Sequence, residues 1–374
     1  MANMKSSFKS LSLLLTLLLC ANTAMPCTTF VLKGKGRVYF GRNLDWFWED
    51  GLVVINPRDA QKTAFLMTEH SPVKWTSRFG SVTFNQFGRE LPFGGMNEAG
   101  LVVENMQLGE TGYAAADSRP AINLLQWIQY QLDNCRSVAE VIATDQNLRV
   151  ESPPASMGSL ALVHYLVCDA DGDCAALEFL DGKMVVHRGA TLPCPALANS
   201  TYEASAAHLR AHPEPAQPSA RAQDESSLSR FAQAAARASA FKPRQPEEDL
   251  DYAFDTLEQV CQGNFTVWRI VYEVSARKIH YCTRSNDRKR SVDLKSLDFS
   301  GARAVQFVDI QAKPAAPQGL PVEDLTEARH RKYLESFYSQ ASLKEKLGDL
   351  KPLAEGLLLT LRGYTRGSEA AGLR

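Results

Sequence analysis

Short apolar runs of strand length, separated by turn residues, dominate the chain from residue 27 onwards and restrict the folds open to it. Thr28–Lys33 and Arg37–Arg42 flank Gly34-Lys35-Gly36, which predicts a β-hairpin with a short glycine-bearing turn. The other strand candidates are Leu52–Asn56, Ser81–Asn85, Gly100–Met106, Leu160–Val167, Ala175–Leu180 and Met184–His187. Helical spacing of apolar residues marks Ala121–Cys135, Val138–Ala143, Ser227–Ala240 and Leu250–Cys261. Because these blocks follow no regular βαβ rhythm, they predict an α+β fold of packed antiparallel sheets covered by helices.

The first 26 residues have the composition of an export signal. Lys5 and Lys9 precede an apolar run from Leu11 to Ala21, and small residues such as Ala24 follow it. A charged start, a short apolar core and a small-residue exit are typical of a secretory signal peptide. The run is too short for a bilayer, which needs about 20 apolar residues. We therefore expect a secreted or periplasmic mature protein without a membrane span.

Charge and composition indicate an ordinary globular protein. The formal net charge is -1, and 45% of the residues are hydrophobic. Nucleic acids and anionic membranes select basic surfaces, so neither is expected as a partner. The sequence has no Cys-x-x-Cys motif, and His208 and His212 have no Glu between them. We therefore expect no metal and no cofactor.

The cysteines fit an oxidising compartment. Cys20 lies in the predicted signal and Cys27 at the predicted start of the mature chain, which leaves an even set at 135, 168, 174, 194, 261 and 282. Cys168 and Cys174 bracket the turn-rich stretch Asp169–Asp173, and a hairpin there would place the two thiols opposite each other. We favour a disulfide between these two. The other four are left open between disulfides and buried thiols.

Removal of residues 1–26 would give Cys27 two reactive groups, a thiol and an α-amine. The amine can take the thiol proton directly or through one water, so the thiolate can attack an amide carbonyl without a histidine. Pro26 is a poor residue for signal peptidase to cut after, so we expect cleavage near Ala24 and autocatalytic loss of the remainder. The predicted hairpin returns Arg42 and Asp45 to Cys27, where Arg42 would lower the thiol pKa and Asp45 would orient the amine.

Several motifs occur in a fixed order along the chain. They are Cys27-Thr28-Thr29-Phe30, Tyr39-Phe40-Gly41-Arg42-Asn43-Leu44-Asp45, Gly95-Met96-Asn97-Glu98-Ala99-Gly100-Leu101, Leu197-Ala198-Asn199-Ser200, Ser229-Arg230-Phe231 and the hairpin Thr266–Cys282. In residues and order this set resembles the choloylglycine hydrolase family, which contains bile salt hydrolases and penicillin V acylases. The resemblance covers roughly residues 27–285 and leaves out the tail after about residue 315.

The resemblance implies an αββα four-layer sandwich of the N-terminal nucleophile hydrolase type, which cleaves a linear amide through a thioester. Cys27 would be the nucleophile and, through its amine, the base, with Arg42 and Asp45 as its supporting pair. Asn199 would donate a side-chain N–H to the oxyanion, an interaction whose removal costs about 3–4 kcal/mol of transition-state stabilisation. Arg230 would complete the electrostatic frame. The same resemblance implies a homo-oligomer, a tetramer.

One departure from the family pattern concerns the substrate. After the Asn-Glu-x-Gly-Leu motif, bile salt hydrolases carry an oxyanion asparagine and penicillin V acylases a tyrosine. Here Gln107 holds that position and Asn105 lies two residues earlier. With export, this favours a penicillin V acylase or an N-acyl homoserine lactone acylase over a conjugated bile salt hydrolase. An inactive secreted binding protein on the same fold is the alternative of another class.

The chain thus divides into three predicted segments. Residues 1–26 are a signal peptide and short pro-segment, residues 27–310 an amidohydrolase domain, and residues 311–374 a linker and C-terminal helical extension. The expected partner is a small-molecule N-acyl amide. Trp46, Phe47, Trp48 and Trp75 are candidates for the lining of its acyl pocket.

Overall fold

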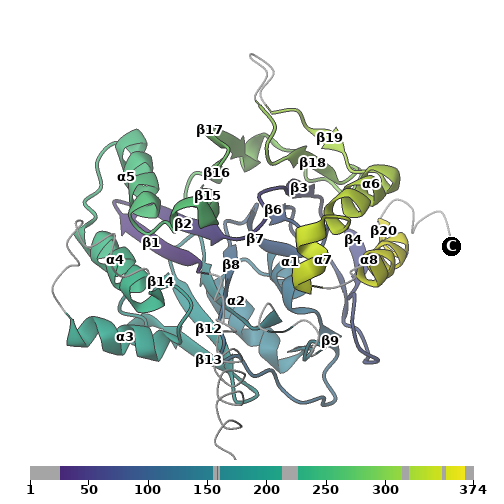
Figure 1. Cartoon of the computed structure of the whole chain (residues 1–374), viewed down its shortest axis with the longest axis horizontal. Coiled ribbons are helices and arrows are strands. Elements are labelled where there is room, and N and C mark those ends of the chain that lie inside the picture. The colour runs from purple at the N-terminus through teal and green to yellow at the C-terminus, as the bar shows by residue number, and fades with distance from the viewer. Residues whose placement is uncertain are drawn as a thin grey trace, which may run out of the picture.

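Two large antiparallel sheets form the centre of the protein (Figure 1). The computed structural model describes residues 26–154, 158, 161–212, 226–313, 320–347 and 351–366. The predicted signal peptide, apart from Pro26, lies outside the described residues, as does most of the Ala/Pro-rich stretch before residue 226. Within the described part, no helix has the length and apolar content needed to cross a bilayer.

The first sheet contains the strand that follows Cys27. Its six strands are, in spatial order, β14 (Ala196–Leu197), β1 (Thr28–Gly34), β2 (Arg37–Asp45), β15 (Thr266–Glu273), β16 (Lys278–Thr283) and β17 (Asn286–Asp293). The turn between β1 and β2 has Lys35 and Gly36 at φ 50° and 73°, the left-handed region that a two-residue hairpin loop requires. This turn sets the register, which pairs Thr29 with Arg42.

The second sheet has nine strands and lies against the first. In spatial order they are β13 (Lys183–Arg188), β12 (Cys174–Leu180), β11 (Val163–Cys168), β8 (Val102–Gln107), β7 (Pro92–Asn97), β6 (Ser81–Asn85), β3 (Leu52–Asn56), β18 (Gln306–Asp309) and β19 (Glu323–Asp324). The Tyr272 ring joins the two sheets, with its centroid 5.9 Å from Phe40 and 6.3 Å from Phe84. Strands between two layers are buried on both faces, which is why β2 and β3 read as continuous buried runs.

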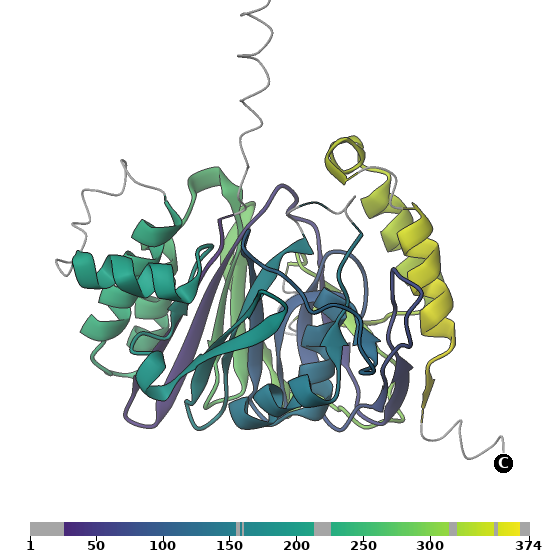
Figure 2. The same ribbon diagram turned by 90° about the horizontal axis from the view of Figure 1, so that it is seen from below.

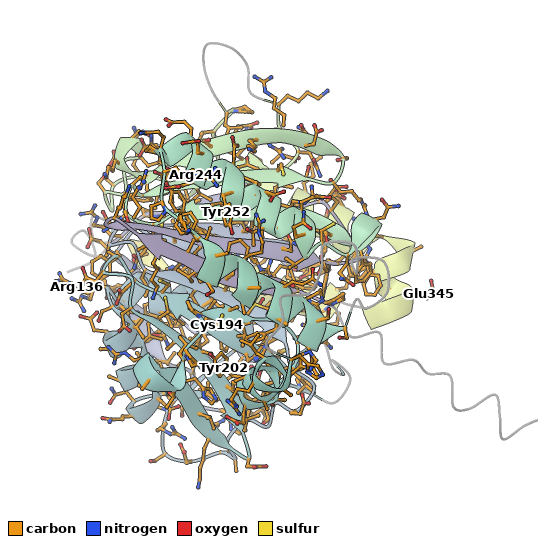
Figure 3. The ribbon with its side chains drawn as sticks, turned by 90° about the vertical axis from the view of Figure 1, so that its left-hand side faces the viewer. Arg136, Cys194, Tyr202, Arg244, Tyr252 and Glu345 are labelled. Atoms are coloured by element: carbon orange, nitrogen blue, oxygen red, sulfur yellow. The ribbon has the colours of Figure 1, made fainter. Side chains whose placement is uncertain are left out.

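Helices cover the outer faces of both sheets (Figures 1 and 2). On the first sheet lie α4 (Ser227–Ala240) and α5 (Pro246–Gln259), and α3 (Tyr202–Ala211) packs on α4. Figure 3 looks onto this layer, where Tyr252 of α5 donates a hydrogen bond to the Arg237 carbonyl of α4 at 2.8 Å. On the second sheet lies α1 (Leu124–Asn134), which α2 (Val138–Ala143) follows. The order helix, sheet, sheet, helix confirms the predicted αββα sandwich.

Two predicted helix starts were wrong. Ala121–Ile122 is strand β9, which pairs with β10 (Arg149–Val150), because the Asn123 side chain accepts from the Leu125 N–H and starts α1 only there. Helix α5 begins at Pro246, four residues before the predicted start, because proline suits the first turn of a helix and the Glu248 carboxylate accepts from the Gln245 N–H.

The tail of the chain returns to the main body. It forms α6 (Glu327–Tyr338), α7 (Ala341–Leu347), α8 (Lys351–Arg362) and β20 (Thr365–Arg366). Strand β20 extends a small sheet made of β4 (Ala60–Thr63) and β5 (Lys74–Thr76), pairing with β4. Figures 1 and 2 both show the three helices along the side of the molecule remote from β1.

The two cysteines for which a disulfide was favoured face each other. Cys168 of β11 and Cys174 of β12 are direct cross-strand partners, and their Sγ atoms lie 2.8 Å apart as thiols. Because a hairpin already holds both residues, forming the bond requires little backbone movement. We expect protein secreted into an oxidising medium to carry this disulfide. Its mass should be lower by about 2 Da, the mass of the two hydrogens lost, and peptide mapping should show that both thiols are blocked. Full alkylation of both thiols without reductant would contradict this.

Candidate active site

Cys27 lies just before β1. Its side chain is 4% exposed, and hydrogen bonds to its backbone hold it in place. Its N–H donates to Asn199 Oδ1 at 2.8 Å. Its carbonyl accepts from an Arg230 Nη1 at 2.5 Å, and the other end of that guanidinium donates to Asn199 Oδ1 at 2.8 Å. Arg230 also bonds Thr28 Oγ1 at 2.6 Å. Asn199 follows β14 and Arg230 lies in the first turns of α4, so three distant segments fix one residue.

Arg42 provides a buried cation beside the thiol. Its Nη2 lies 3.9 Å from Cys27 Sγ and donates to the Asn105 carbonyl at 3.0 Å. Its Nε lies 2.8 Å from Glu104 Oε2 of the opposite sheet, with both side chains at most 1% exposed. Tyr272 donates to the other oxygen of Glu104. Burial raises the pKa of Glu104 to about 7 against the lowering effect of Arg42.

Asp45 is the last residue of β2, and its two carboxylate oxygens differ in their hydrogen bonding. Thr266 donates to its Oδ1, whereas Oδ2 is buried and has no hydrogen-bond partner among the described residues. Burial raises the pKa of Asp45 to about 7, although Thr266, Arg230 and Arg42 each lower it. A buried oxygen without a hydrogen bond lowers the stability of the folded protein. Such an oxygen in a native site therefore marks a position where a further hydrogen-bond donor would bind.

Burial also has the largest effect on the pKa of the Cys27 thiol. It raises the pKa of Cys27, while the charge of Arg42 lowers it and the charge of Asp45 raises it again. The thiol therefore stays protonated with Pro26 in place. A further positive charge beside it would favour the thiolate.

The thiol faces an apolar pocket of about 820 Å³, a volume that includes its solvent-open mouth. The polar residues around it are Cys27, Arg42, Asn105, Gln107 and Asn123. The apolar ones are Leu44, Trp46, Met67, Phe87, Leu91, Phe93, Met106, Leu124, Leu125, Val163 and Leu353. A pocket of this kind suits a ligand with a large apolar body and one polar group near Cys27.

The structure brings the five predicted catalytic residues together at one place. Four of them, Cys27, Arg42, Asn199 and Arg230, are joined by the contacts above, and the charge of the fifth, Asp45, acts on the Cys27 thiol. The Asn199 side-chain N–H that the resemblance assigned to the oxyanion donates to the Gln107 carbonyl at 2.9 Å.

The predicted binding residues fare differently. Asn105, Gln107 and Trp46 line the pocket, but Phe47, Trp48 and Trp75 do not. Trp75 was a wrong candidate, because its ring packs on Tyr130 at 5.3 Å and its Nε1 donates to the buried Asp133 at 2.7 Å. The Trp48 ring instead packs on the Phe337 ring of α6, with 6.3 Å between the ring centroids.

A buried pair behind Asn199 was absent from the sequence-based predictions. His164 of β11 has Nδ1 3.0 Å from Glu178 Oε1 and Nε2 2.8 Å from the Ala198 carbonyl. Burial alone would raise the pKa of Glu178, but hydrogen bonds from His164 and His187 lower it to about 2. The pair fixes the residue before Asn199, and no local sequence signal marks it.

No group of three or more His, Cys, Asp or Glu side chains that could hold a metal ion occurs in the ranges that the structure describes. The groups that the site brings together are a thiol, two guanidinium groups, a carboxylate and amides, beside an apolar pocket. Such a set can attack a carbonyl carbon and stabilise negative charge on its oxygen.

Comparisons with known proteins agree with this arrangement. The family model for linear amide C-N hydrolases of the choloylglycine hydrolase family matches residues 27–240. A penicillin V acylase from Pectobacterium atrosepticum is 28% identical over 197 residues, 49% of this chain and 52% of the relative. The chain thus spans about half the length of this curated relative.

Solved structures show the same fold. The penicillin V acylase from Agrobacterium tumefaciens superposes with a TM-score of 0.64 at 25% identity, over 76% of this chain and 91% of that one. A variant of conjugated bile acid hydrolase from Clostridium perfringens superposes with a TM-score of 0.63 at 17% identity, over 80% of this chain and 100% of that one. The family match begins at Cys27 itself and includes Arg42, Asp45, Asn199 and Arg230. The chain belongs to the choloylglycine hydrolase family of linear amide C-N hydrolases.

Proposed function

We propose that this protein is an exported cysteine hydrolase that cleaves the amide bond of an N-acyl substrate with the N-terminal residue of its processed chain. The observation that carries the proposal is the convergence of Arg42, Asn199 and Arg230 on Cys27 at the wall of an apolar pocket. Export rests on the sequence of residues 1–26, which lie outside the described part except for Pro26.

Loss of Pro26 would complete the site. The new α-amine would take the place of the Cys27 N–H that now donates to Asn199 Oδ1. It would carry additional protons, and the unpaired Asp45 Oδ2 is a buried acceptor whose charge already acts on Cys27. A protonated amine there adds a positive charge next to the thiol and lowers its pKa, and the neutral amine can accept the thiol proton.

The proposed reaction has two stages, formation and hydrolysis of a thioester. The Cys27 sulfur bonds to the amide carbon, and the oxygen that becomes negative is stabilised by side-chain N–H donors such as Asn199 and Asn105 or Gln107. The α-amine passes its proton to the departing nitrogen as the C–N bond breaks, which leaves a thioester. Water, deprotonated by the same amine, hydrolyses the thioester to a carboxylic acid and restores the thiol.

The pocket favours an apolar acyl group. Trp46 packs on Phe93 at 5.3 Å and on Phe87 at 6.4 Å, so this wall is a rigid aromatic surface. The two penicillin V acylases, at 28% and 25% identity, support a substrate of that type more than the bile acid hydrolase at 17% does. We propose a penicillin V or N-acyl homoserine lactone acylase, with conjugated bile salts as poorer substrates.

A substrate panel tests this proposal. Purified processed protein is incubated with penicillin V, N-acyl homoserine lactones, glycocholate and taurocholate, and the released amine is measured. We expect hydrolysis of penicillin V or of the lactones with kcat/KM at least about tenfold above either bile salt, since the hydroxyl groups of the cholate acyl part would be left without hydrogen bonds against an apolar wall. A preference for bile salts would overturn the subclass. Processed, folded protein that binds these amides but hydrolyses none would indicate a binding protein.

A further inference from the structure

One wall of the pocket comes from the C-terminal tail. Leu353 of α8 lines it together with Cys27, although α8 lies outside residues 27–240, which match the family model. Figures 1 and 2 both place α8 on the side of the molecule remote from β1, which follows Cys27. The pocket therefore extends from the thiol towards α8.

Helix α6 holds a second part of this wall. Three of its side chains bind the backbone of the β6–β7 loop. Tyr333 donates to the Gln86 carbonyl at 2.8 Å, Tyr338 donates to the Phe87 carbonyl at 2.9 Å, and His330 Nε2 accepts from the Arg89 N–H at 3.0 Å. Because the Phe87 ring lines the pocket, α6 fixes the position of a lining residue by its main chain.

The backbone of the loop lies directly against side chains of α6. Gly88 has φ 104°, and a Cβ there would lie 2.8 Å from both His330 Nε2 and Leu334 Cδ2. Any other residue type at this position would be strained at this φ and would have to displace the His330 and Leu334 side chains. The Phe337 ring completes the contact, 5.8 Å from the Phe87 ring.

The far end of the tail is anchored as well. Tyr364, which follows α8, donates to the Thr63 carbonyl at 3.0 Å and accepts from Gln126 Nε2 at 2.8 Å. A Cβ at Gly356 of α8 would lie 3.0 Å from the Phe65 ring. Leu357 is fully buried one helical turn after Leu353, whereas Leu359 is 69% exposed. The face of α8 that carries Leu353 is therefore packed inwards, and Leu359 lies on the solvent side.

We propose that α8 closes the acyl pocket and that Leu353 determines the length of the acyl chain the enzyme accepts. This rests on the proposed amide hydrolysis and names its substrate class more closely, as N-acyl amides whose apolar acyl group reaches from Cys27 to α8. A larger side chain at this position shortens the pocket, and a smaller one lengthens it. The hydrogen bonds described for Cys27 come from Asn199, Arg42 and Arg230, which lie far from α8 in the sequence, so the change should act on the acyl end of the pocket.

A ladder of N-acyl homoserine lactones, from butanoyl to tetradecanoyl, tests the proposal with Leu353→Trp, Leu353→Ala and the matched control Leu359→Trp on the same helix. We expect Leu353→Trp to lower kcat/KM for the longest lactones about 10- to 100-fold relative to the butanoyl compound, the range for a changed apolar contact. Leu353→Ala should raise it for the longest ones. The effect of both variants should grow with the length of the acyl chain, and Leu359→Trp should match the wild type for every lactone.

A binding experiment separates this inference from the proposed function. Titration of free fatty acids, butanoate to tetradecanoate, into Cys27→Ala protein is followed by calorimetry and needs no turnover. If the wild type hydrolyses no amide but the Leu353 variants shift the preferred fatty acid, the proposed function fails and the wall assignment stands. If the acyl profiles of the Leu353 variants equal the wild type in both experiments, the wall assignment is overturned. Leu353→Met replaces the tryptophan variant if that one does not fold.

Discussion

Replacement of Cys27 by alanine is expected to abolish amide hydrolysis and to leave Pro26 on the chain. Among the cysteines that the structure describes, Cys27 alone lines the pocket, and its sulfur is the atom next to Arg42. Removing the nucleophile of an enzyme that works through a covalent intermediate costs at least about 10⁴-fold in kcat. The alanine protein should fold, because the side chain is small and few contacts are lost. Amine release and the intact mass with N-terminal sequencing measure the two outcomes.

Two further variants make this result specific. Cys194→Ala removes another partly buried thiol, outside the pocket, and should keep wild-type activity and a chain that starts at Cys27. Cys27→Ser keeps a weaker nucleophile at the same place and should process and react far more slowly. An active alanine protein, or a wild-type mature chain that starts upstream of Cys27, would rule out the proposed mechanism.

Replacement of Arg42 by methionine is expected to lower both stability and activity, and the two losses can be separated. Without Arg42, the fully buried Glu104 loses its only ion-pair partner within the described part of the chain. Breaking a buried ion pair from one side costs about 3–5 kcal/mol, because the carboxylate left in the interior is uncompensated and has to take up a proton. Urea denaturation should therefore show a free energy of unfolding lower by about that amount.

The double variant Arg42→Met/Glu104→Gln should recover most of the stability, because neither charge remains and Tyr272 can still donate to the amide oxygen. Activity should not recover, since the cation 3.9 Å from the Cys27 sulfur is still missing. Arg58→Met is the matched control, because it breaks a partly exposed pair with Glu98 and should cost only about 1 kcal/mol. Recovery of activity together with stability in the double variant would show that Arg42 acts only through Glu104.

The parts of the site that lie close in the sequence could be predicted, and those that depend on tertiary contacts could not. Arg42 and Asp45 were placed beside Cys27 because a two-residue turn fixes the register of a hairpin. Glu104 is different. It follows two valines in a strand, and nothing in that run distinguishes a buried ion-pair partner from a polar residue at a strand edge.

The helical tail illustrates the same limit. Its apolar spacing predicted helices, but the surface they cover depends on which faces of the main body remain open after the two sheets have packed. In the sequence, nothing distinguishes Trp46 from Trp75 as a candidate for the pocket lining. The structure distinguishes them by their neighbours, because Trp75 donates to Asp133 in the core and Trp46 packs on Phe93 in the pocket wall. Family motifs supplied Asn199 and Arg230, for which the local pattern alone had no signal.

The order of strands in the first sheet has a consequence for the timing of synthesis. The first strand of the domain follows Cys27, yet Arg230 contacts Cys27 across 203 residues, and Thr266 contacts Asp45 across 221. Contacts this far apart in sequence form late, after most of the chain has emerged. Under the proposed mechanism, the thiol is therefore among the first parts of the domain to be made and among the last to become reactive. A growing chain would carry an ordinary cysteine, which would become a nucleophile only once the sheet has closed around it.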